Sequence, residues 1–432
     1  MCKDNLRNIK NKINILIEEP AVIPGESPIP VSGKIIDENE LKFMVDATLD
    51  GWLTTGRFND LFEKKLSTFL GIKHVHTVNS GSSANLVAFS TLTSEVLGDR
   101  AIKVGDEVIT VAAGFPTTIN PILQFGAIPV FVDIDIKTHN INVEKIEQAI
   151  SSKTKAIMLA HSLGNPFNLK VIIEICRKYK LWLIEDNCDA LGSKYNNQLT
   201  GTFGDISTLS FYPAHHITMG EGGAVLTNNS TLSKIIKSYR DWGRDCYCDP
   251  GRDNTCGKRF EWKLGTLPEG YDHKYIYNHM GYNLKITDMQ AACGLGQLNK
   301  LEKFIESRKN NFSYLYNRLK TCSDFFDLPV ATNNSDPSWF GFLLTIKPDT
   351  NIRRVDLLKY LEQEKIGTRL LFAGNLVRQP YMKNKKFIIS EELINTDIVM
   401  NNSFWIGVYP GLNNEMLDYT VDKIETFVGL NF

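Results

Sequence analysis

Residues 105–135 read GDEVITVAAGFPTTINPILQFGAIPVFVDID, in which two apolar runs flank a segment of helical character. The runs at 105–112 and 127–135 have the length of strands, and residues 115–126 predict the helix between them. The same alternation continues on both sides, with further strands expected at 74–80, 154–161, 181–187 and 205–212 and a helix at 82–96. Alternating strands and helices predict an α/β fold with a mostly parallel sheet covered on both faces.

The rest of the chain divides into regions of different character. Residues 1–33 form a polar arm with prolines, a helix is expected at 37–50, and one long helix is expected over 285–320. Residues 243–275 are rich in Gly, Asp and Cys, which predicts a long functional loop, because long structureless loops are otherwise uncommon. We therefore expect an N-terminal arm at 1–33, a large α/β domain at 34–300 and a smaller C-terminal α+β domain at 301–432.

Composition excludes several classes of protein. The 432 residues include 48 basic and 49 acidic side chains, for a net charge of −1. This balance argues against a nucleic-acid partner and against a polybasic membrane binder. No stretch reaches the ~18 apolar residues of a spanning helix, and the first twenty residues lack the features of a signal peptide. We expect this protein to be a cytoplasmic enzyme. We expect neither a membrane nor a nucleic acid among its partners.

Three short motifs near the ends of predicted strands are candidates for chemistry. Gly81 and Ser82 open a helix, where free backbone N–H groups attract an anion. Asp186 follows a strand at the edge where open α/β sheets bind ligands, and it suits a protonated pyridine nitrogen. Phe115 begins a helix after another strand and offers a ring for stacking. Each motif alone has an ordinary alternative: a helix cap, a turn aspartate or a core phenylalanine.

In this order and spacing the motifs resemble the DegT/DnrJ/EryC1/StrS sugar aminotransferase family, the pyridoxal-phosphate enzymes that act on nucleotide-linked 4-keto-sugars. The resemblance covers about residues 35–430 and implies the type I, aspartate aminotransferase-like fold, with a smaller C-terminal domain. The segments that carry it are GWLTTG at 51–56, NSGSSAN at 79–85, GFPTTINPI at 114–122, GAIPVFVDID at 126–135, HSLGNP at 161–166, IEDNCDALGS at 184–193, STLSFYPAHH at 207–216, GEGGAVLTN at 220–228 and GYNLKITDMQAA at 281–292.

The resemblance implies a role for each cofactor contact. The ring of Phe115 stacks on the pyridine, and Asp186 pairs with its nitrogen. The phosphate is bound by Ser210 and by the backbone at Gly81 and Ser82.

The resemblance implies further contacts with the cofactor, with a second subunit and with the sugar. Asp189 is a cofactor contact, and Asn283 reaches the phosphate from the neighbouring subunit, which implies a homodimer with shared active sites. Sugar contacts vary within such a family, and those implied here are Trp52, Thr55, Arg369 and Asn375.

The chain departs from the family pattern at one position. The family has Ser-Phe-x-x-x-Lys before its Gly-x-Gly-Gly segment, whereas this chain has His215 in place of the lysine. An imidazole has no primary amine, so it cannot bind the cofactor covalently, although it can still move a proton. Histidine at this position is typical of the sugar 3-dehydrases of the family, which work with the aminated cofactor, pyridoxamine phosphate.

Four of the eight cysteines are spaced as C-x57-C-x-C-x7-C: Cys188, Cys246, Cys248 and Cys256. This spacing resembles the ligands of a [2Fe–2S] cluster in the 3-dehydrases that act on CDP-4-keto-6-deoxyglucose. Four thiolates also suit tetrahedral zinc, which stays the physical alternative, although the spacing is unusual for a zinc finger. A cluster implies a partner, an NAD(P)H-dependent flavin or iron–sulfur reductase.

The expected activity is removal of the C3 hydroxyl from a CDP-linked 4-keto-6-deoxyhexose, followed by reduction, in the synthesis of 3,6-dideoxyhexoses for surface polysaccharide. A dTDP-linked substrate is the first alternative. A plain aminotransferase is opposed by the missing lysine. A scaffold without catalysis is opposed by the retained Asp186, Ser210 and Asn283.

Overall fold

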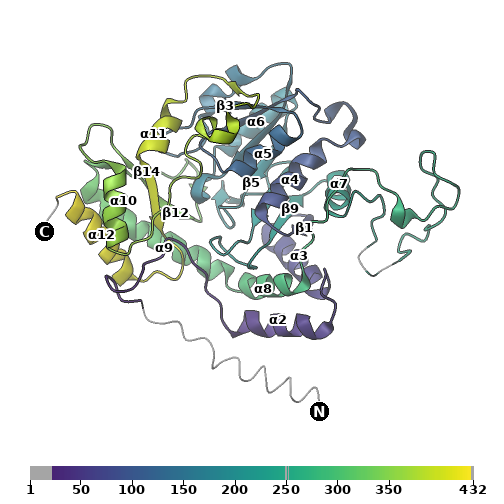
Figure 1. The fold of residues 1–432 in the computed structure, drawn as a ribbon, viewed down its shortest axis with the longest axis horizontal. Coiled ribbons are helices and arrows are strands. Elements are labelled where there is room, and N and C mark those ends of the chain that lie inside the picture. Colours follow the sequence, from purple (N-terminus) through teal and green to yellow (C-terminus); the bar gives the residue numbers. More distant parts are fainter. Residues whose placement is uncertain (1–21, 249–250, 252, 430–432) are drawn as a thin grey trace, which may run out of the picture.

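The computed structural model describes residues 22–248, 251 and 253–429. Of the expected N-terminal arm, residues 1–21 lie outside the described residues. The described chain forms a large unit around one sheet, a smaller unit beside it and an extended arm at the opposite end (Figure 1). In the described residues no helix is long and apolar enough to cross a bilayer.

The main sheet has the order β1-β9-β8-β5-β4-β2-β3-β13. The pairs from β8 to β13 are parallel, and β9 runs antiparallel to both β8 and β1, so the sheet is mostly parallel, as expected. Its strands are β1 (His74–Val78), β2 (Glu107–Val111), β3 (Ile128–Val132), β4 (Thr154–Ala160), β5 (Trp182–Asp186), β8 (Ile206–Ser210), β9 (Gly223–Thr227) and β13 (Ile388–Ile389).

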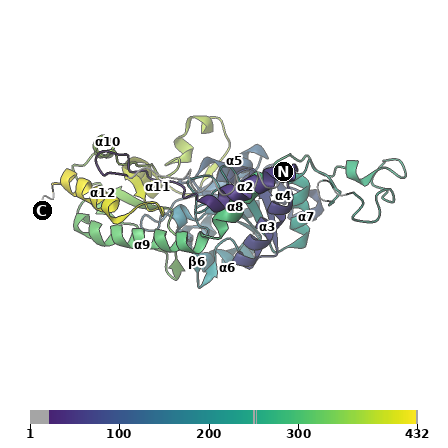
Figure 2. The same cartoon turned by 90° about the horizontal axis from the view of Figure 1, so that it is seen from below.

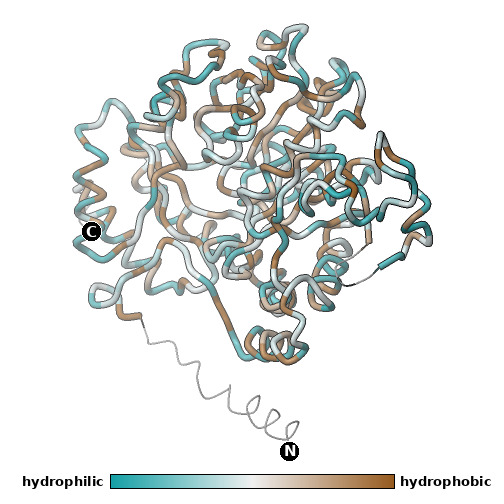
Figure 3. The backbone as a smooth tube through the Cα atoms, turned by 45° about the vertical axis from the view of Figure 1, so that its right-hand side comes forward, coloured by the Kyte–Doolittle hydropathy of each residue, from teal (hydrophilic) through white to brown (hydrophobic). Residues whose placement is uncertain are grey.

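Helices cover both faces of this sheet. Alternate strand residues point to opposite sides: Ile184 of β5 packs in the core under α4, α5 and α7, whereas Leu183 packs in the core under α6. Apolar stretches concentrate in the middle of the molecule and hydrophilic stretches on its periphery (Figure 3). The helices of this unit are α2 (Glu38–Asp50), α3 (Arg57–Leu70), α4 (Gly81–Leu92), α5 (Pro116–Gln124), α6 (Leu169–Tyr179), α7 (Ser230–Arg240) and α8 (Asp288–Leu298).

The expected single helix over 285–320 is wrong. The chain forms α8, which ends at Leu298, and then α9 (Leu301–Leu319). Between them Lys300 extends its ammonium group to α2, where Nζ lies 2.6 Å from Glu40 Oε1 and 3.1 Å from Asp37 Oδ2. Glu40 is fully buried, so this contact ties the break to the large unit while α9 continues into the smaller one (Figure 2).

The smaller unit packs a sheet of order β10-β12-β14 against helices around its own core. The expected mixture of strands and helices is present here, although one strand, β13, returns to the edge of the main sheet. The elements are β10 (Phe326–Asp327), β12 (Gly341–Ile346), β14 (Ser403–Gly407), α10 (Arg354–Gln363), α11 (Ile394–Asn402) and α12 (Asn414–Phe427); a further sheet joins β6 (Lys194–Tyr195), β7 (Gln198–Leu199) and β11 (Ser335–Asp336).

The cysteine-rich segment forms the extended arm. We call residues 243–280, as far as they are described, the cysteine arm. Its regular structure is limited to the short 3-10 helix η6 (His273–Tyr275), in agreement with the expected long loop. Figures 1 and 2 show it leaving the large unit at the end opposite the smaller unit.

Candidate cofactor site and cysteine arm

The expected cofactor residues meet at the carboxyl edge of the main sheet. Asp186 ends β5, Ser210 ends β8, Gly81 begins α4 after β1, and Phe115 precedes α5 after β2. Parallel strands end at one edge, so residues far apart in the sequence become neighbours there. We call this group of residues, together with those that follow β5 and β8, the cofactor cup.

Asp186 is held in one orientation at the centre of the cup. Its Oδ2 accepts hydrogen bonds from Asn85 Nδ2 at 2.8 Å and from Thr118 Oγ1 at 2.7 Å. Its Oδ1 accepts a bond from the backbone N–H of Cys188 at 3.2 Å, and the side chain is buried. Thr208 Oγ1 donates a longer bond to the same Oδ1 at 3.5 Å. A buried carboxylate fixed by four donors suits a cationic ring nitrogen, so this residue fits the pyridine of a pyridoxal-type cofactor.

Sequence reasoning missed two of these donors as functional residues. Asn85 and Thr118 both lie inside motifs that carry the family resemblance, NSGSSAN and GFPTTINPI. Asn85 Oδ1 also accepts a bond from Thr208 Oγ1 at 2.7 Å, which links α4 to β8. Their position in the motifs is the only sequence signal, because their common partner, Asp186, is 101 and 68 residues away.

The start of α4 forms a cradle with the end of β8. A Cβ atom on Gly81 would lie 2.5 Å from Ser210 Cβ and 3.1 Å from Cys188 Sγ, so only glycine fits. Ser80 caps the helix by accepting a bond from Ser83 N, while the first N–H groups of a helix have no partner within the helix. Ser82 places its hydroxyl 3.2 Å from Thr117 Oγ1. Backbone N–H groups and hydroxyls around a glycine suit a phosphate.

His215 follows β8 and faces Asp189, which follows β5. The distance from His215 Nδ1 to Asp189 Oδ1 is 3.4 Å, and Nδ1 has no hydrogen-bond partner among the described residues. Burial lowers the pKa of His215 to about 4, and burial together with the charge of Asp186 raises the pKa of Asp189 to about 8. At neutral pH the imidazole is therefore uncharged and able to accept a proton.

Arg308 of α9 supports the backbone that carries His215, and sequence reasoning missed it. Its guanidinium is almost fully buried and donates to the carbonyl oxygens of His215 at 3.3 Å and Ala214 at 3.5 Å. It also donates to Trp339 O at 3.3 Å, which connects the cup to the smaller unit. No local pattern marks Arg308, since His215 is 93 residues away in the sequence.

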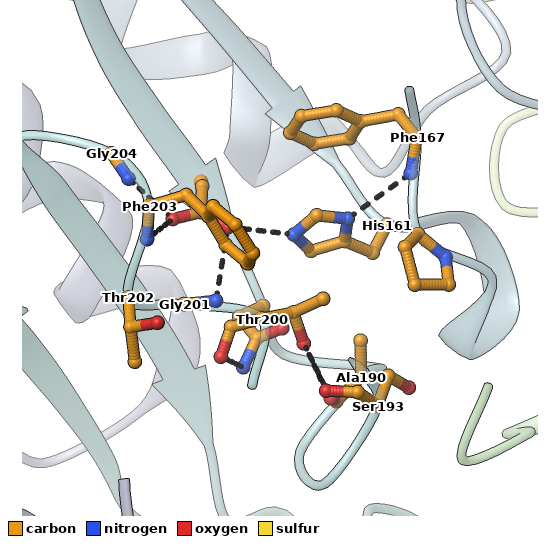
Figure 4. Close-up of polar contacts among 12 residues, drawn as sticks. His161, Phe167, Ala190, Ser193, Thr200, Gly201, Thr202, Phe203 and Gly204 are labelled. Atoms are coloured by element: carbon orange, nitrogen blue, oxygen red, sulfur yellow. Dashed lines mark hydrogen bonds and ion pairs between the residues drawn. The ribbon is translucent and has the colours of Figure 1, made fainter. Parts of the chain in front are cut away.

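Beneath the cup, Glu185 joins four donors. The carboxylate accepts bonds from the backbone N–H groups of Gly201, Phe203 and Gly204 at 2.6–2.9 Å and lies 3.1 Å from His161 Nε2 (Figure 4). Phe167 N donates to His161 Nδ1 at 3.3 Å, so the ring proton lies on Nε2. Since Glu185 precedes Asp186, this network also positions the carboxylate that is expected to pair with the ring nitrogen.

The remaining expected contacts are bonded to partners other than the cofactor residues named above. Asn283 is exposed at the base of the cysteine arm, where its Oδ1 accepts a bond from Lys285 Nζ at 2.6 Å. Trp52 donates to Thr55 O at 2.9 Å, and its indole lies beside Gly251 of the arm. Asn375 is buried, and both ends of its side-chain amide are already bonded, Nδ2 to Asp397 and Oδ1 to Val377 N. Arg369 is exposed and pairs through its backbone with Trp405.

The structure separates the four expected cluster ligands. Cys246, Cys248 and Cys256 line one small pocket of the cysteine arm. Cys188 belongs to the cup, next to Gly81 and Asp186. No group of three or more His, Cys, Asp or Glu side chains in the described chain is arranged to hold a metal ion.

The described chain therefore fits a pyridoxal-type cofactor better than a four-thiolate metal centre. The donors of the cup match a pyridoxal-type cofactor in phosphate, ring nitrogen and proton-transfer group. For a four-thiolate centre, one described chain brings three thiols close and leaves the fourth elsewhere. Within the arm, burial raises the pKa of Cys246. Partial burial opposes ionisation of Cys248 too, but hydrogen bonds from the side chains of Thr255 and Cys246 and from the backbone of Thr255 and Cys256 together outweigh it and lower the pKa of that thiol.

Fold and cup together define an enzyme of the pyridoxal-phosphate-dependent aminotransferase fold. The model of the DegT/DnrJ/EryC1/StrS aminotransferase family matches residues 34–425, and the chain belongs to this family. The chain is 62% identical to the lipopolysaccharide biosynthesis protein RfbH of Salmonella typhimurium, over 98% of this chain and 99% of that protein. It is 52% identical to dTDP-4-dehydro-2,6-dideoxy-D-glucose 3-dehydratase of Saccharopolyspora spinosa, over 95% and 89%.

Solved structures support the same fold. The structure of a mutant GDP-4-keto-6-deoxymannose-3-dehydratase with bound GDP-perosamine has a TM-score of 0.83 and 29% identity, and covers 91% of this chain and 99% of that one. The Escherichia coli GDP-4-keto-6-deoxy-D-mannose-3-dehydratase with bound hydrated PLP has a TM-score of 0.82 and 29% identity, over 91% and 98%. The expected type I fold is confirmed.

Proposed function

We propose that this chain is a nucleotide-sugar 3-dehydratase that uses pyridoxamine phosphate. The observation that carries the proposal is His215, an imidazole placed in the cup where the family has a lysine. The sequence has no lysine between Lys194 and Lys234, so this segment offers no amine for covalent attachment. The names of the Saccharopolyspora and Escherichia relatives, both 3-dehydratases, support the same reaction class.

The residues of the cup divide the work. When bound, pyridoxamine phosphate supplies an amine that condenses with the C4 ketone of the sugar and a ring that accepts electrons as the C3 hydroxyl leaves as water. Asp186 keeps the ring nitrogen protonated, and Phe115 covers the ring. The neutral imidazole of His215 removes a proton from the C4′ carbon of the cofactor. Asp189 Oδ1, 3.4 Å from Nδ1, would orient that imidazole by a hydrogen bond that is not formed in the present geometry.

We propose CDP-4-keto-6-deoxy-D-glucose as the substrate and a 3,6-dideoxy-4-keto sugar as the product after reduction. The name of the 62% identical relative, a lipopolysaccharide biosynthesis protein, supports a route to O-antigen dideoxyhexoses. The name of the 52% identical relative supports the alternative, a dTDP-linked sugar. Trp52, Thr55 and Arg369 remain proposed sugar contacts, and Asn375 would require a rearrangement of its bond to Asp397.

The proposed enzyme also carries a [2Fe–2S] cluster and receives electrons from a reductase, and it works as a homodimer in the cytoplasm. The shared pocket of Cys246, Cys248 and Cys256 supports the cluster. The side chain of Asn283 is exposed and bonded to Lys285 rather than to a residue of the cup, which leaves it accessible to a second subunit and supports the dimer.

The test is a substrate panel. The protein with pyridoxamine phosphate is incubated with CDP-, dTDP- and GDP-linked 4-keto-6-deoxyhexoses in ¹⁸O-water, and label at C3 is measured by mass spectrometry. We expect incorporation with the CDP-sugar, since reversible dehydration exchanges the C3 oxygen. Incorporation with the dTDP-sugar alone would select the alternative substrate. Formation of a 4-amino sugar from glutamate, without exchange at C3, would show an aminotransferase instead.

A further inference from the structure

The helix α4 runs from the neighbourhood of Cys188 to the base of the cysteine arm. Cys188 Sγ lies beside Gly81, the first residue of α4. At the other end of α4, Ser94 Oγ lies 2.7 Å from Nε2 of His279 in the cysteine arm. A helix of 12 residues is about 18 Å long. The arm therefore departs from the molecule near the end of α4 that is remote from Cys188.

Backbone pairing at the base of the arm gives its direction. Asn79 N donates to Leu284 O near the start of α4. Further out, Arg244 pairs with Tyr277, and Asp245 N donates to Ile276 O. The two paired strands of chain at the base of the arm therefore start near the Cys188 end of α4, pass Ser94 at its other end, and continue away from the helix. Where the arm approaches its own body again, at Gly251, the neighbouring side chain is Trp52.

The cysteine arm also exposes an unusual set of large apolar side chains. Met280 is 92% exposed, and five aromatic residues are between 40% and 56% exposed. Exposed apolar groups gathered on one projecting segment indicate that another surface covers it. The five aromatic residues are Tyr247, Phe260, Tyr271, Tyr275 and Tyr277.

We propose, resting on the cluster and the dimer proposed above, that the iron–sulfur centre is assembled between two copies of this chain. Cys246, Cys248 and Cys256 come from the arm of one subunit, and Cys188 comes from the cup of the other. The apolar side chains of the arm are then covered by the second copy. Asn283 lies at the base of the same arm, so one segment serves the neighbouring cup with both a phosphate contact and three thiolates.

A hybrid dimer tests this division. One subunit carries Cys188→Ser and the other Cys256→Ser, with two different affinity tags, so that the hybrid is isolated by both tags after subunit exchange. If ligands come from two chains, one of the two centres in the hybrid has all four cysteines. If all four come from one chain, each centre in the hybrid lacks one. The readouts are iron and sulfide per dimer and the visible spectrum after reconstitution.

We expect each homodimeric variant to lose the cluster and the hybrid to recover about half of the iron of the parent. A hybrid as empty as both homodimers, with subunit exchange demonstrated by the tags, would overturn the division between chains. A Cys188→Ser homodimer that keeps the iron of the parent would overturn it as well, because Cys188 would then be no ligand. Binding of pyridoxamine phosphate by both variants shows that each is folded.

A different result would contradict the proposed cluster itself. If the parent holds no iron or sulfide after reconstitution, the cluster itself is absent, whatever the hybrid does. If the parent holds the cluster and runs as a monomer on a sizing column, the proposed dimer and the shared centre are both wrong.

Discussion

The cofactor cup and the cysteine arm hold their side chains in opposite ways. In the cup, Glu185 is fully buried and accepts four hydrogen bonds, and the buried Asp186 also accepts four. In the arm, the ion pair of Arg259 with Asp272 has side chains that are 32% and 18% exposed, and the three cysteines lie in loop segments. The carboxylates of the cup are held in place by hydrogen bonds within one chain, whereas the centre proposed for the arm requires a metal and a second surface.

The strongest test of the cup is His215→Asn. The variant should bind pyridoxamine phosphate, because the phosphate and ring contacts lie elsewhere. Substrate-dependent exchange of the cofactor C4′ proton should fall by about 10²–10⁴-fold, the usual effect of removing a general base. The matched control is His216→Asn, since His216 is buried next to it but bonds to Ser338 O. Exchange at the parent rate in the first variant, measured by NMR, would mean that His215 is not the base.

The second test removes the buried support under the cup. Glu185→Ala leaves three backbone N–H groups and His161 without an acceptor, so the free energy of unfolding should fall by about 3–5 kcal/mol. Urea unfolding followed by circular dichroism measures this. Glu185→Gln keeps a carbonyl acceptor and the shape of the side chain, so its loss should be smaller. Equal stability of the alanine variant and the parent would show that the network does not hold the cup.

A pH series tests the pair of His215 and Asp189, to which the proposed function assigns proton transfer. The pKa of Asp189, about 8 when folded, lies above its value in the unfolded chain, so the folded state binds more protons and stability falls as the pH rises toward 8. The lowered pKa of His215 makes stability rise with pH instead, but only between about pH 4 and its unfolded pKa of about 6.5. Asp189→Asn should therefore weaken the loss of stability between about pH 6.5 and pH 8. An unchanged slope in urea unfolding of the cofactor-free protein would contradict the raised pKa.

The smallest effect is expected in the arm. Arg259→Ala removes the ion pair with Asp272, which belongs to the arm and not to the main sheet. The urea midpoint should stay that of the parent, while limited proteolysis should cut the arm faster. A lower midpoint would show that the arm supports the large unit, and the contrast between the two regions would then disappear.

Much of the site could be predicted from residue types and their order. The alternation around residues 105–135 predicted the parallel sheet, whereas the family resemblance implied that Gly81, Phe115 and Asp186 belong to one site. The sheet could be predicted because strand periodicity and helix starts are local properties. Parallel strands then bring their carboxyl ends, and the residues that follow them, to one edge. The substitution of lysine by His215 was likewise visible as a single letter in a known motif.

Contacts between distant segments required the tertiary structure. The pattern over 285–320 is continuous and free of proline, so nothing local predicted the break at Lys300, which the buried Glu40 of α2 stabilises from a distant part of the sequence. Arg308 was invisible for the same reason. Cysteine spacing predicted four ligands but not their separation, because spacing counts residues along the chain, and the folding of α4 and the arm decided how far apart the thiols lie.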